Sequence, residues 1–173
     1  MSQIQYLQIV LFAAAAAIAF GLFTTNKLLS LPKGSKKMIA ISGAIQEGAK
    51  AYLNRQYTTI AIVGIVIFFA FFLIPFKHVY DVPVGFLIGA VLSGLAGYIG
   101  MNVSVRANVI TAQAASSSLK QGLYVAFNAG AVTGLLVVGL ALAGIAGYFF
   151  ALYFGFERTG RELIEPLVAL GFG

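Results

Sequence analysis

The stretch Gly97–Ala115, GYIGMNVSVRANVITAQAA, decides the fold because it joins two kinds of helix pattern without a break. Its first residues are apolar and rich in glycine, as in a membrane-spanning helix. Its later residues carry polar side chains at Asn102, Ser104, Arg106, Asn108, Thr111 and Gln113. After Gly100 it contains neither glycine nor proline, the residues that most readily end a helix. We therefore expect a single helix that leaves the membrane and continues into water.

The composition of the whole chain predicts an integral membrane protein. Of its 173 residues, 60% are hydrophobic and 9% are charged, whereas a soluble domain is about 45–50% apolar and about 25% charged. A net charge of +6 often indicates nucleic-acid binding. Here the basic residues flank apolar runs and no soluble domain carries them, so membrane topology explains them better and we expect no nucleic-acid partner.

Four uncharged apolar runs predict four membrane-spanning helices, because a helix needs about 20 apolar residues to cross the hydrocarbon core. The runs cover Ile4–Phe23, Thr58–Phe76, Val84–Val105 and Leu123–Phe156. We expect the fourth helix to tilt or protrude, with its span over residues 123–152. A fifth apolar segment, residues 166–173, is too short to span. The predicted fold class is all-α: one membrane domain, a polytopic transmembrane helix bundle with four spanning helices and the start of a fifth.

Residues 38–57 precede the second run and have the most polar helix pattern in the chain. No helix breaker separates them from that run, so we expect one long helix with a cytoplasmic extension. Glu47 can pair with Lys50, three residues later, for about 0.2–0.5 kcal/mol. A solvated helix face just outside the membrane is the simpler interpretation of these charges.

The distribution of lysine and arginine predicts the orientation of the chain. Residues 24–57 hold six of these cations and residues 105–121 hold two. The other side holds Lys77, Arg158 and Arg161. By the positive-inside rule, the first and third loops face the cytoplasm and both termini face outward. A cleaved signal peptide is the alternative for the first run, but residues 1–6 lack the lysine or arginine that such a peptide carries.

Two stripes of small residues predict close helix packing. Small residues repeated every four positions let helix backbones approach each other in lipid. In the third run the stripe is Gly85, Gly89, Ser93 and Gly97, and in the fourth it is Gly122, Ala126, Gly130 and Gly134. The stripes indicate a helix bundle but no particular function.

Polar side chains near the expected cytoplasmic ends are candidates for structural contacts. They are Glu47, Lys50, Arg55, Asn102, Arg106 and Asn108. Arg106 could bind an anion such as phosphate through its fork of donors, or it could extend its cation to the membrane surface. A third interpretation is a polar contact with another helix, because Asn102 and Gln113 lie on roughly the same face. We expect one of the two structural interpretations rather than ligand binding.

The acidic residues indicate that this chain carries no catalytic, cofactor-binding or metal-binding residue. They are Glu47, Asp81, Glu157, Glu162 and Glu165, and none lies within an expected span. An intramembrane relay for protons or sodium needs such a residue, and Mg²⁺ needs clustered carboxylates. The chain also has no cysteine, a single histidine (His78), and no glycine-rich phosphate loop that ends in Lys-Ser or Lys-Thr.

Four segments resemble the membrane-bound, ion-translocating inorganic pyrophosphatases. Glu47–Ile60 (EGAKAYLNRQYTTI) resembles the second-helix signature of that family, and Gly97–Ala115 is similar to its third helix and following loop. Gly122–Leu140 (GLYVAFNAGAVTGLLVVGL) resembles the fourth helix, and Pro166–Gly173 (PLVALGFG) the opening of the fifth. Their order and spacing also match, over nearly the whole chain. Ile110 departs from the bacterial pattern, which usually has a second arginine there, and this weakens any case for a charge contact by that loop.

The resemblance implies a much larger fold, with about sixteen transmembrane helices in two concentric rings. The inner ring would carry the pyrophosphate site and the ion gate, and the four helices of this chain would belong to the outer ring. The implied activity is hydrolysis of Mg-pyrophosphate on the cytoplasmic side, coupled to outward pumping of H⁺ or Na⁺. Mg²⁺ and, as a further candidate, K⁺ would be bound by motifs beyond Gly173.

The chain is then expected to be an N-terminal scaffold piece of such an enzyme, inactive by itself. Its implied partners are the remaining helices of the full-length polypeptide, a second copy in a homodimer, the lipid bilayer, and pyrophosphate as the substrate of the complete enzyme. The implied location is the bacterial cell (inner) membrane, with the N-terminus outside.

Two other interpretations are open at this point. A free-standing four-helix membrane protein, such as a small transporter subunit or an assembly partner, would form a stable bundle by itself. A basic membrane-surface or nucleic-acid module would need a soluble domain, which the composition does not allow.

Overall fold

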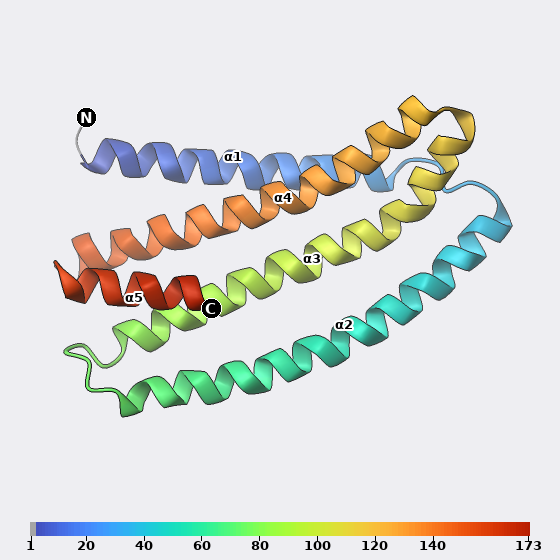
Figure 1. The fold of residues 1–173 in the computed structure, drawn as a ribbon. Coiled ribbons are helices and arrows are strands. Elements are labelled where there is room, and N and C mark those ends of the chain that lie inside the picture. The colour runs from blue at the N-terminus through green and yellow to red at the C-terminus, as the bar shows by residue number, and fades with distance from the viewer. Residues whose placement is uncertain (1–2) are drawn as a thin grey trace.

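The computed structural model describes residues 3–173 and is almost entirely helical (Figure 1). Its α-helices are α1 (Gln3–Leu29), α2 (Lys36–Ala70), α3 (Asp81–Ser117), α4 (Leu119–Phe150) and α5 (Arg161–Phe172). A 3-10 turn, η1 (Phe71–Leu73), prolongs α2, and a π-helical turn, η2 (Ala151–Gly155), ends α4. Four helical segments are each long and apolar enough to cross a membrane: Ile4–Leu29, Lys36–Leu73, Asp81–Ser117 and Leu119–Gly155. The predicted all-α class, with four spanning helices and a fifth, is confirmed.

Helices α2 and α3 are longer than a membrane crossing requires. The 37 residues of α3 extend about 55 Å at 1.5 Å per residue, against about 30 Å of hydrocarbon. Helix α3 runs unbroken through residues 97–115, as the sequence predicts. Helix α2 likewise joins residues 38–57 to the apolar run that follows. It begins where the Ser35 hydroxyl accepts a hydrogen bond from the Met38 backbone N–H at 3.3 Å, a regular N-cap.

The turns that separate the helices have local causes. Pro75 disfavours helical backbone at the residue before it, and Ile74 is extended with φ −93° and ψ 129°, so α2 and η1 end before the apolar run does. Between α3 and α4 a single extended residue, Ser118, reverses the chain and accepts a hydrogen bond from the Gln121 backbone N–H at 3.2 Å. Gly160 adopts φ 59°, which glycine reaches at little cost, immediately before α5.

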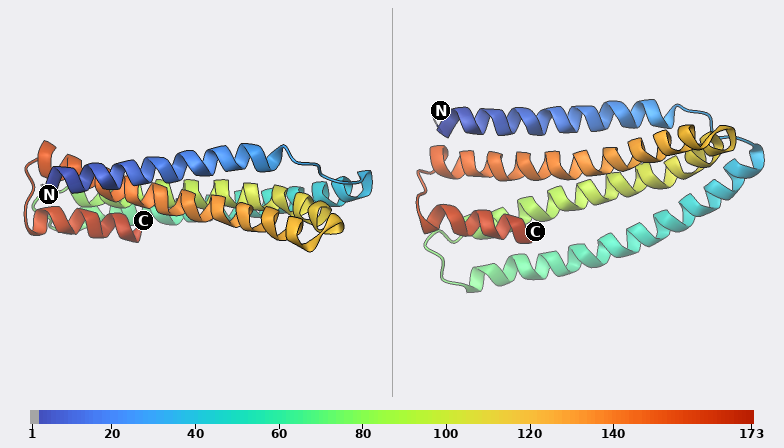
Figure 2. Two further views of the ribbon diagram at one scale, coloured as in Figure 1. Left: turned by 90° about the horizontal axis from the view of Figure 1, so that it is seen from above. Right: turned by 45° about the horizontal axis from the view of Figure 1, so that its top comes forward.

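The four long helices lie side by side in the order α1, α4, α3, α2, and α5 packs beside α3 and α4 (Figures 1 and 2). The start of α1, the α2–α3 loop and the α4–α5 loop lie at one end of this array (Figure 1). The α1–α2 loop and the α3–α4 turn lie at the other end. Lys33, Lys36, Lys37 and Lys120 belong to this second end, which is the end that the charge count predicts to be cytoplasmic.

The main core lies between α1, α3 and α4. Its buried members are Leu28, Val103, Ala107, Val109, Ile110, Val125, Ala129, Val132 and Leu136. Ile110 is 1% exposed and is among the largest fully buried side chains. The residue that departs from the bacterial arginine pattern is therefore a packed core residue in this chain.

Helix α2 lies at the edge of the array and is mostly exposed. Ile41, Ile45 and Tyr52, which the helix period places on one side, are exposed. The side that packs toward α3 instead contains the buried Ser42 and Leu53. Because the rest of the helix is strongly apolar, its outward faces need lipid or further helices to cover them.

The glycine stripe of α3 packs closely against another helix, as predicted, and the structure shows that this helix is α5. A Cβ at Gly85 would overlap the backbone carbonyl of Pro166, and a Cβ at Gly89 would overlap that of Leu170. At Gly97 a Cβ would meet the Tyr57 hydroxyl instead. Glycine is thus required where α5 approaches α3 most closely.

The stripe of α4 has a different outcome. Gly122 packs against Ala115, but Ala126 is exposed, and a Cβ at Gly130 or Gly134 would find no atom within 4 Å among residues 3–173. Beyond Gly122 the stripe of α4 therefore meets no partner among the described residues, and its role as a packing face stays a prediction. Helix α4 packs on α1 through another glycine, Gly139, whose added Cβ would lie 3.1 Å from the Ala14 carbonyl.

Candidate functional site

Most of the polar residues that the sequence singles out lie between α2 and α3, toward the cation-rich end. They surround a pocket of about 240 Å³ lined by Gln46, Glu47, Ala49, Lys50, Leu53, Asn102, Val105 and Arg106. Two cations and one carboxylate thus face a shared opening from two helices. Gln113, which the sequence places on roughly the same face as Arg106, does not line this pocket. It lines a separate pocket of about 580 Å³ beside Leu31 and Lys120.

The contacts of these residues are local. The Asn102 side-chain amide donates to the Tyr98 carbonyl at 2.8 Å, one turn earlier on α3. Glu47, Lys50 and Arg106 are exposed, and none takes part in the ion pairs that residues 3–173 form. In particular, the pairing of Glu47 with Lys50 that the sequence allows is not formed.

Two further candidates lie outside this pocket. Arg55 is exposed, and its backbone carbonyl accepts the Thr59 hydroxyl at 3.1 Å. Asn108 is exposed beside another pocket, of about 190 Å³, that also contains Met38 and Ser42. A structural contact of the Arg55, Asn108 or Arg106 side chain with another helix therefore stays a prediction.

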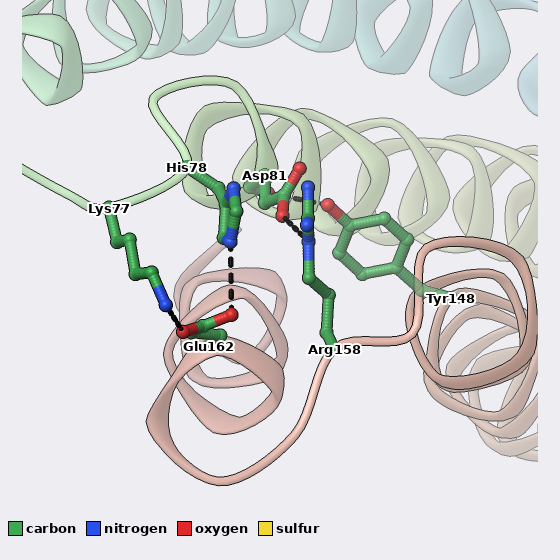
Figure 3. Close-up of polar contacts among 6 residues, drawn as sticks. All are labelled: Lys77, His78, Asp81, Tyr148, Arg158 and Glu162. Carbon is green, nitrogen blue, oxygen red and sulfur yellow. Dashed lines mark hydrogen bonds and ion pairs between the residues drawn. The ribbon is translucent and has the colours of Figure 1, made fainter.

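The densest set of polar contacts lies at the opposite end, where the sequence suggested no site. Six residues meet there, from the α2–α3 loop, the start of α3, the end of α4, the α4–α5 loop and the start of α5 (Figure 3). They are Lys77, His78, Asp81, Tyr148, Arg158 and Glu162, and we call them the end cluster. The cluster joins segments that are 67 to 85 residues apart in sequence.

The first part of the end cluster is centred on Asp81. Arg158 Nε donates to Asp81 Oδ2 at 2.8 Å, and the two side chains are 21% and 16% exposed. The Tyr148 hydroxyl donates to the Asp81 backbone carbonyl. Asp81 is also the first residue of α3, where a negative charge interacts favourably with the helix dipole. Together these contacts fix the start of α3 against the end of α4 and the segment before α5.

The second part is centred on Glu162, in the first turn of α5. Lys77 Nζ donates to Glu162 Oε1, and His78 Nε2 lies 3.0 Å from Glu162 Oε2 (Figure 3). The hydrogen bond from Lys77 and, next, that from His78 lower the pKa of Glu162 below its ordinary value. The carboxylate is therefore ionised at neutral pH and anchors α5 to the α2–α3 loop.

The sequence contains a weak signal for the end cluster. The two loops predicted on one side of the membrane carry opposite charges, with Lys77 and Arg158 in reach of Asp81 and Glu162. Helix periodicity does not show which loops lie close together in space. The sequence therefore could not predict which cation pairs with which carboxylate. The chemistry of the cluster is structural, because each carboxylate already has a cationic partner.

The fit of the described residues, 3–173, to the Mg²⁺ that the resemblance implies is poor. Mg²⁺ is usually held by carboxylates together with phosphate oxygens and water. Within residues 3–173 no group of three or more His, Cys, Asp or Glu side chains is placed to hold a metal ion. No chemical step through Mg²⁺ can therefore be assigned to these residues.

Comparison with known proteins identifies the family. The model of the inorganic H⁺ pyrophosphatases matches residues 15–173. The chain belongs to the inorganic H⁺ pyrophosphatase family. The resemblance seen in the sequence is thereby confirmed over nearly the whole chain.

Curated relatives of this H⁺ pyrophosphatase chain are named as ion pumps. A K⁺-insensitive pyrophosphate-energized proton pump of Moorella thermoacetica is 43% identical over 157 residues, which cover 91% of this chain and 22% of that protein. One from Methanosarcina mazei is 42% identical over 169 residues, 93% of this chain and 24% of that protein. A putative K⁺-stimulated pyrophosphate-energized sodium pump of Bacteroides thetaiotaomicron is 39% identical over 144 residues, which cover 81% of this chain and 20% of that protein. The chain thus spans between a fifth and a quarter of these relatives.

Proposed function

We propose that this chain is the N-terminal, outer-ring part of a membrane pyrophosphatase that couples hydrolysis of Mg-pyrophosphate to outward pumping of H⁺ or Na⁺. The observation that carries the proposal is the family match over residues 15–173. It is supported by relatives whose names describe pyrophosphate-energized proton and sodium pumps.

The role of these helices is to hold the pump together. The side-by-side array supports a scaffold role, because it leaves apolar surface on both sides of α2. By the helix period Ile65 and Phe69 lie on one side and Ile60 and Val63 on the opposite side, and all four remain more than half exposed. A helix layer with two apolar faces suits a position between lipid on one side and further helices of the same polypeptide on the other.

The catalytic groups lie in the rest of the polypeptide, together with the sites for Mg²⁺ and, where it is used, K⁺. The state of the acidic residues supports this assignment. Asp81 and Glu162 are engaged with Arg158 and with Lys77 and His78, and Glu47 lies toward the opposite end. Isolated, the chain does not hydrolyse pyrophosphate.

The orientation follows from charge. The cation-rich end, with the α1–α2 loop and the α3–α4 turn, faces the cytoplasm, and the N-terminus and the end cluster face outward. The host membrane is the bacterial cell membrane, and the complete enzyme is a homodimer whose substrate is pyrophosphate.

A segment exchange tests the proposal. The matched part of the Moorella thermoacetica relative is replaced by this chain, and pyrophosphate hydrolysis and proton uptake are measured in inverted membrane vesicles. The exchange protein should keep both activities, because this part contributes the scaffold rather than the catalytic groups. A matched control carries Gly89→Leu in the inserted segment and should lose assembly. An exchange protein that assembles in the membrane yet hydrolyses no pyrophosphate would contradict the proposal.

A further inference from the structure

His78 offers the end cluster a titratable contact. It is the one histidine in the sequence. Its Nε2 lies 3.0 Å from Glu162 Oε2, and both side chains are 27% exposed, so protons from the surrounding solution can reach the pair (Figure 3). Imidazole gains and loses its charge between about pH 5 and pH 8. A histidine in contact with a carboxylate is therefore a pair whose attraction can depend on pH in this range.

Charged groups from several elements surround His78. Lys77 precedes it in the same loop but is 74% exposed and bonds to the other oxygen of Glu162. Asp81, from the start of α3, faces it together with Arg158, which is already paired with that carboxylate. Helix α5 contributes Glu162 and also Glu165, which lines the same small pocket as His78. Three carboxylates and two cations therefore belong to the surroundings of the His78–Glu162 contact.

The element that this contact holds is the start of α5. The helix begins after Gly160 and has no side-chain N-cap. Its first turn therefore depends on its contacts with neighbours. Those contacts are the packing of Pro166 and Leu170 on the glycine stripe of α3 and, at its first turn, the bonds from Lys77 and His78 to Glu162.

We propose that the His78–Glu162 contact is a pH-sensitive latch that anchors the start of α5 to the α2–α3 loop. Acid on the side that this loop faces tightens the latch, and alkali loosens it. The latch rests on the contact between these two residues and not on pyrophosphate chemistry, so it can fail while the proposed function stands. If the loop faces outward as proposed, the latch senses the compartment that receives the pumped ion.

Hydrogen–deuterium exchange of the 173-residue chain in lipid nanodiscs tests the latch. After correction for intrinsic chemical rates, amides of residues 161–172 should exchange about two- to fivefold more slowly at pH 5.5 than at pH 8.0. A change of this size is typical of an exposed ion pair. His78→Gln, which can still donate a hydrogen bond but does not titrate, should abolish the difference, and Glu162→Gln should do the same.

Lys77→Gln is the matched control. It removes a neighbouring cation and leaves His78 in place, so protection should fall at both pH values while their ratio persists. A wild-type α5 whose exchange does not depend on pH would overturn the proposal, and so would a dependence that survives in His78→Gln.

A second measurement applies if helix α5 no longer forms in the variants. With ¹⁵N-labelled histidine, the single imidazole reports its own protonation by NMR in the wild-type chain. The pH midpoint of α5 protection should coincide with the midpoint of the imidazole signal. Midpoints that differ by more than one pH unit would contradict the latch.

Discussion

Arg158 Nε lies 2.8 Å from Asp81 Oδ2 and ties the segment before α5 to the first residue of α3. The two residues are 77 positions apart in sequence, and both side chains are mostly shielded from water. A charge-assisted hydrogen bond in such a place stabilises more than a surface ion pair does.

Removing one partner of this pair should destabilise the chain. Arg158→Gln or Asp81→Asn leaves the other charge partly buried without its partner, and we expect a loss of about 1.5–3 kcal/mol in unfolding free energy. Unfolding by denaturant in detergent micelles measures it. The double variant should lose less than the sum of the two single losses. Strictly additive losses would show that the two side chains do not interact.

Gly89→Ala should weaken the docking of α5. An added Cβ overlaps the backbone of Leu170, which cannot move aside as a flexible side chain can. We expect earlier proteolysis within residues 156–173 and a lower melting temperature. Gly130→Ala is the matched control, because that Cβ meets nothing within 4 Å. It should be neutral or stabilising by up to about 1 kcal/mol through helix propensity. Equal effects of both substitutions would refute the role of the α3 stripe.

Ile110→Ala should open a cavity in the core between α1, α3 and α4. Ile110 is 1% exposed, and truncation of such a side chain costs about 2–5 kcal/mol. Ile65→Ala, on the exposed face of α2, removes the same atoms and should cost far less in the isolated chain. Thermal unfolding of the two variants side by side measures the difference. A smaller loss at Ile110 than at Ile65 would contradict this core.

The stability of the chain should depend on acid through Glu162. Because Lys77 and His78 lower the pKa of Glu162 in the folded chain, its stabilising effect is fully present above the ordinary carboxyl pKa of 4.5. It is lost as the pH falls through the lowered folded pKa. Melting curves of wild type and Glu162→Gln should therefore differ at pH 6 and converge toward pH 3. A constant difference across that range would mean that the charge of Glu162 is irrelevant.

The long helices could be predicted because their signals are local. Uncharged runs and the absence of a breaker after Gly100 are read from neighbouring residues, and α1 to α4 follow from them. Which helices pack against each other does not depend on neighbouring residues alone. The stripe at Gly85 and Gly89 packs against α5, whereas the residues with the same spacing at Gly130 and Gly134 pack against no other helix among residues 3–173.

The end cluster shows the same limit at the level of single contacts. Charge counting placed Lys77 and Arg158 on one side of the membrane, but it could not pair them with Glu162 and Asp81 across more than 70 residues. That pairing depends on how α3, α4 and α5 pack, and only the three-dimensional arrangement supplies it.

Pyrophosphate hydrolysis by the 173-residue chain alone is the most direct test of its role as a scaffold without catalytic groups. The chain is expressed in membranes, supplied with Mg-pyrophosphate, and assayed for phosphate release beside mock membranes and membranes that contain the Moorella thermoacetica relative. The relative should release phosphate, and this chain should release no more than the mock membranes do. Mg²⁺-dependent release above the mock level by residues 1–173 would contradict the scaffold role.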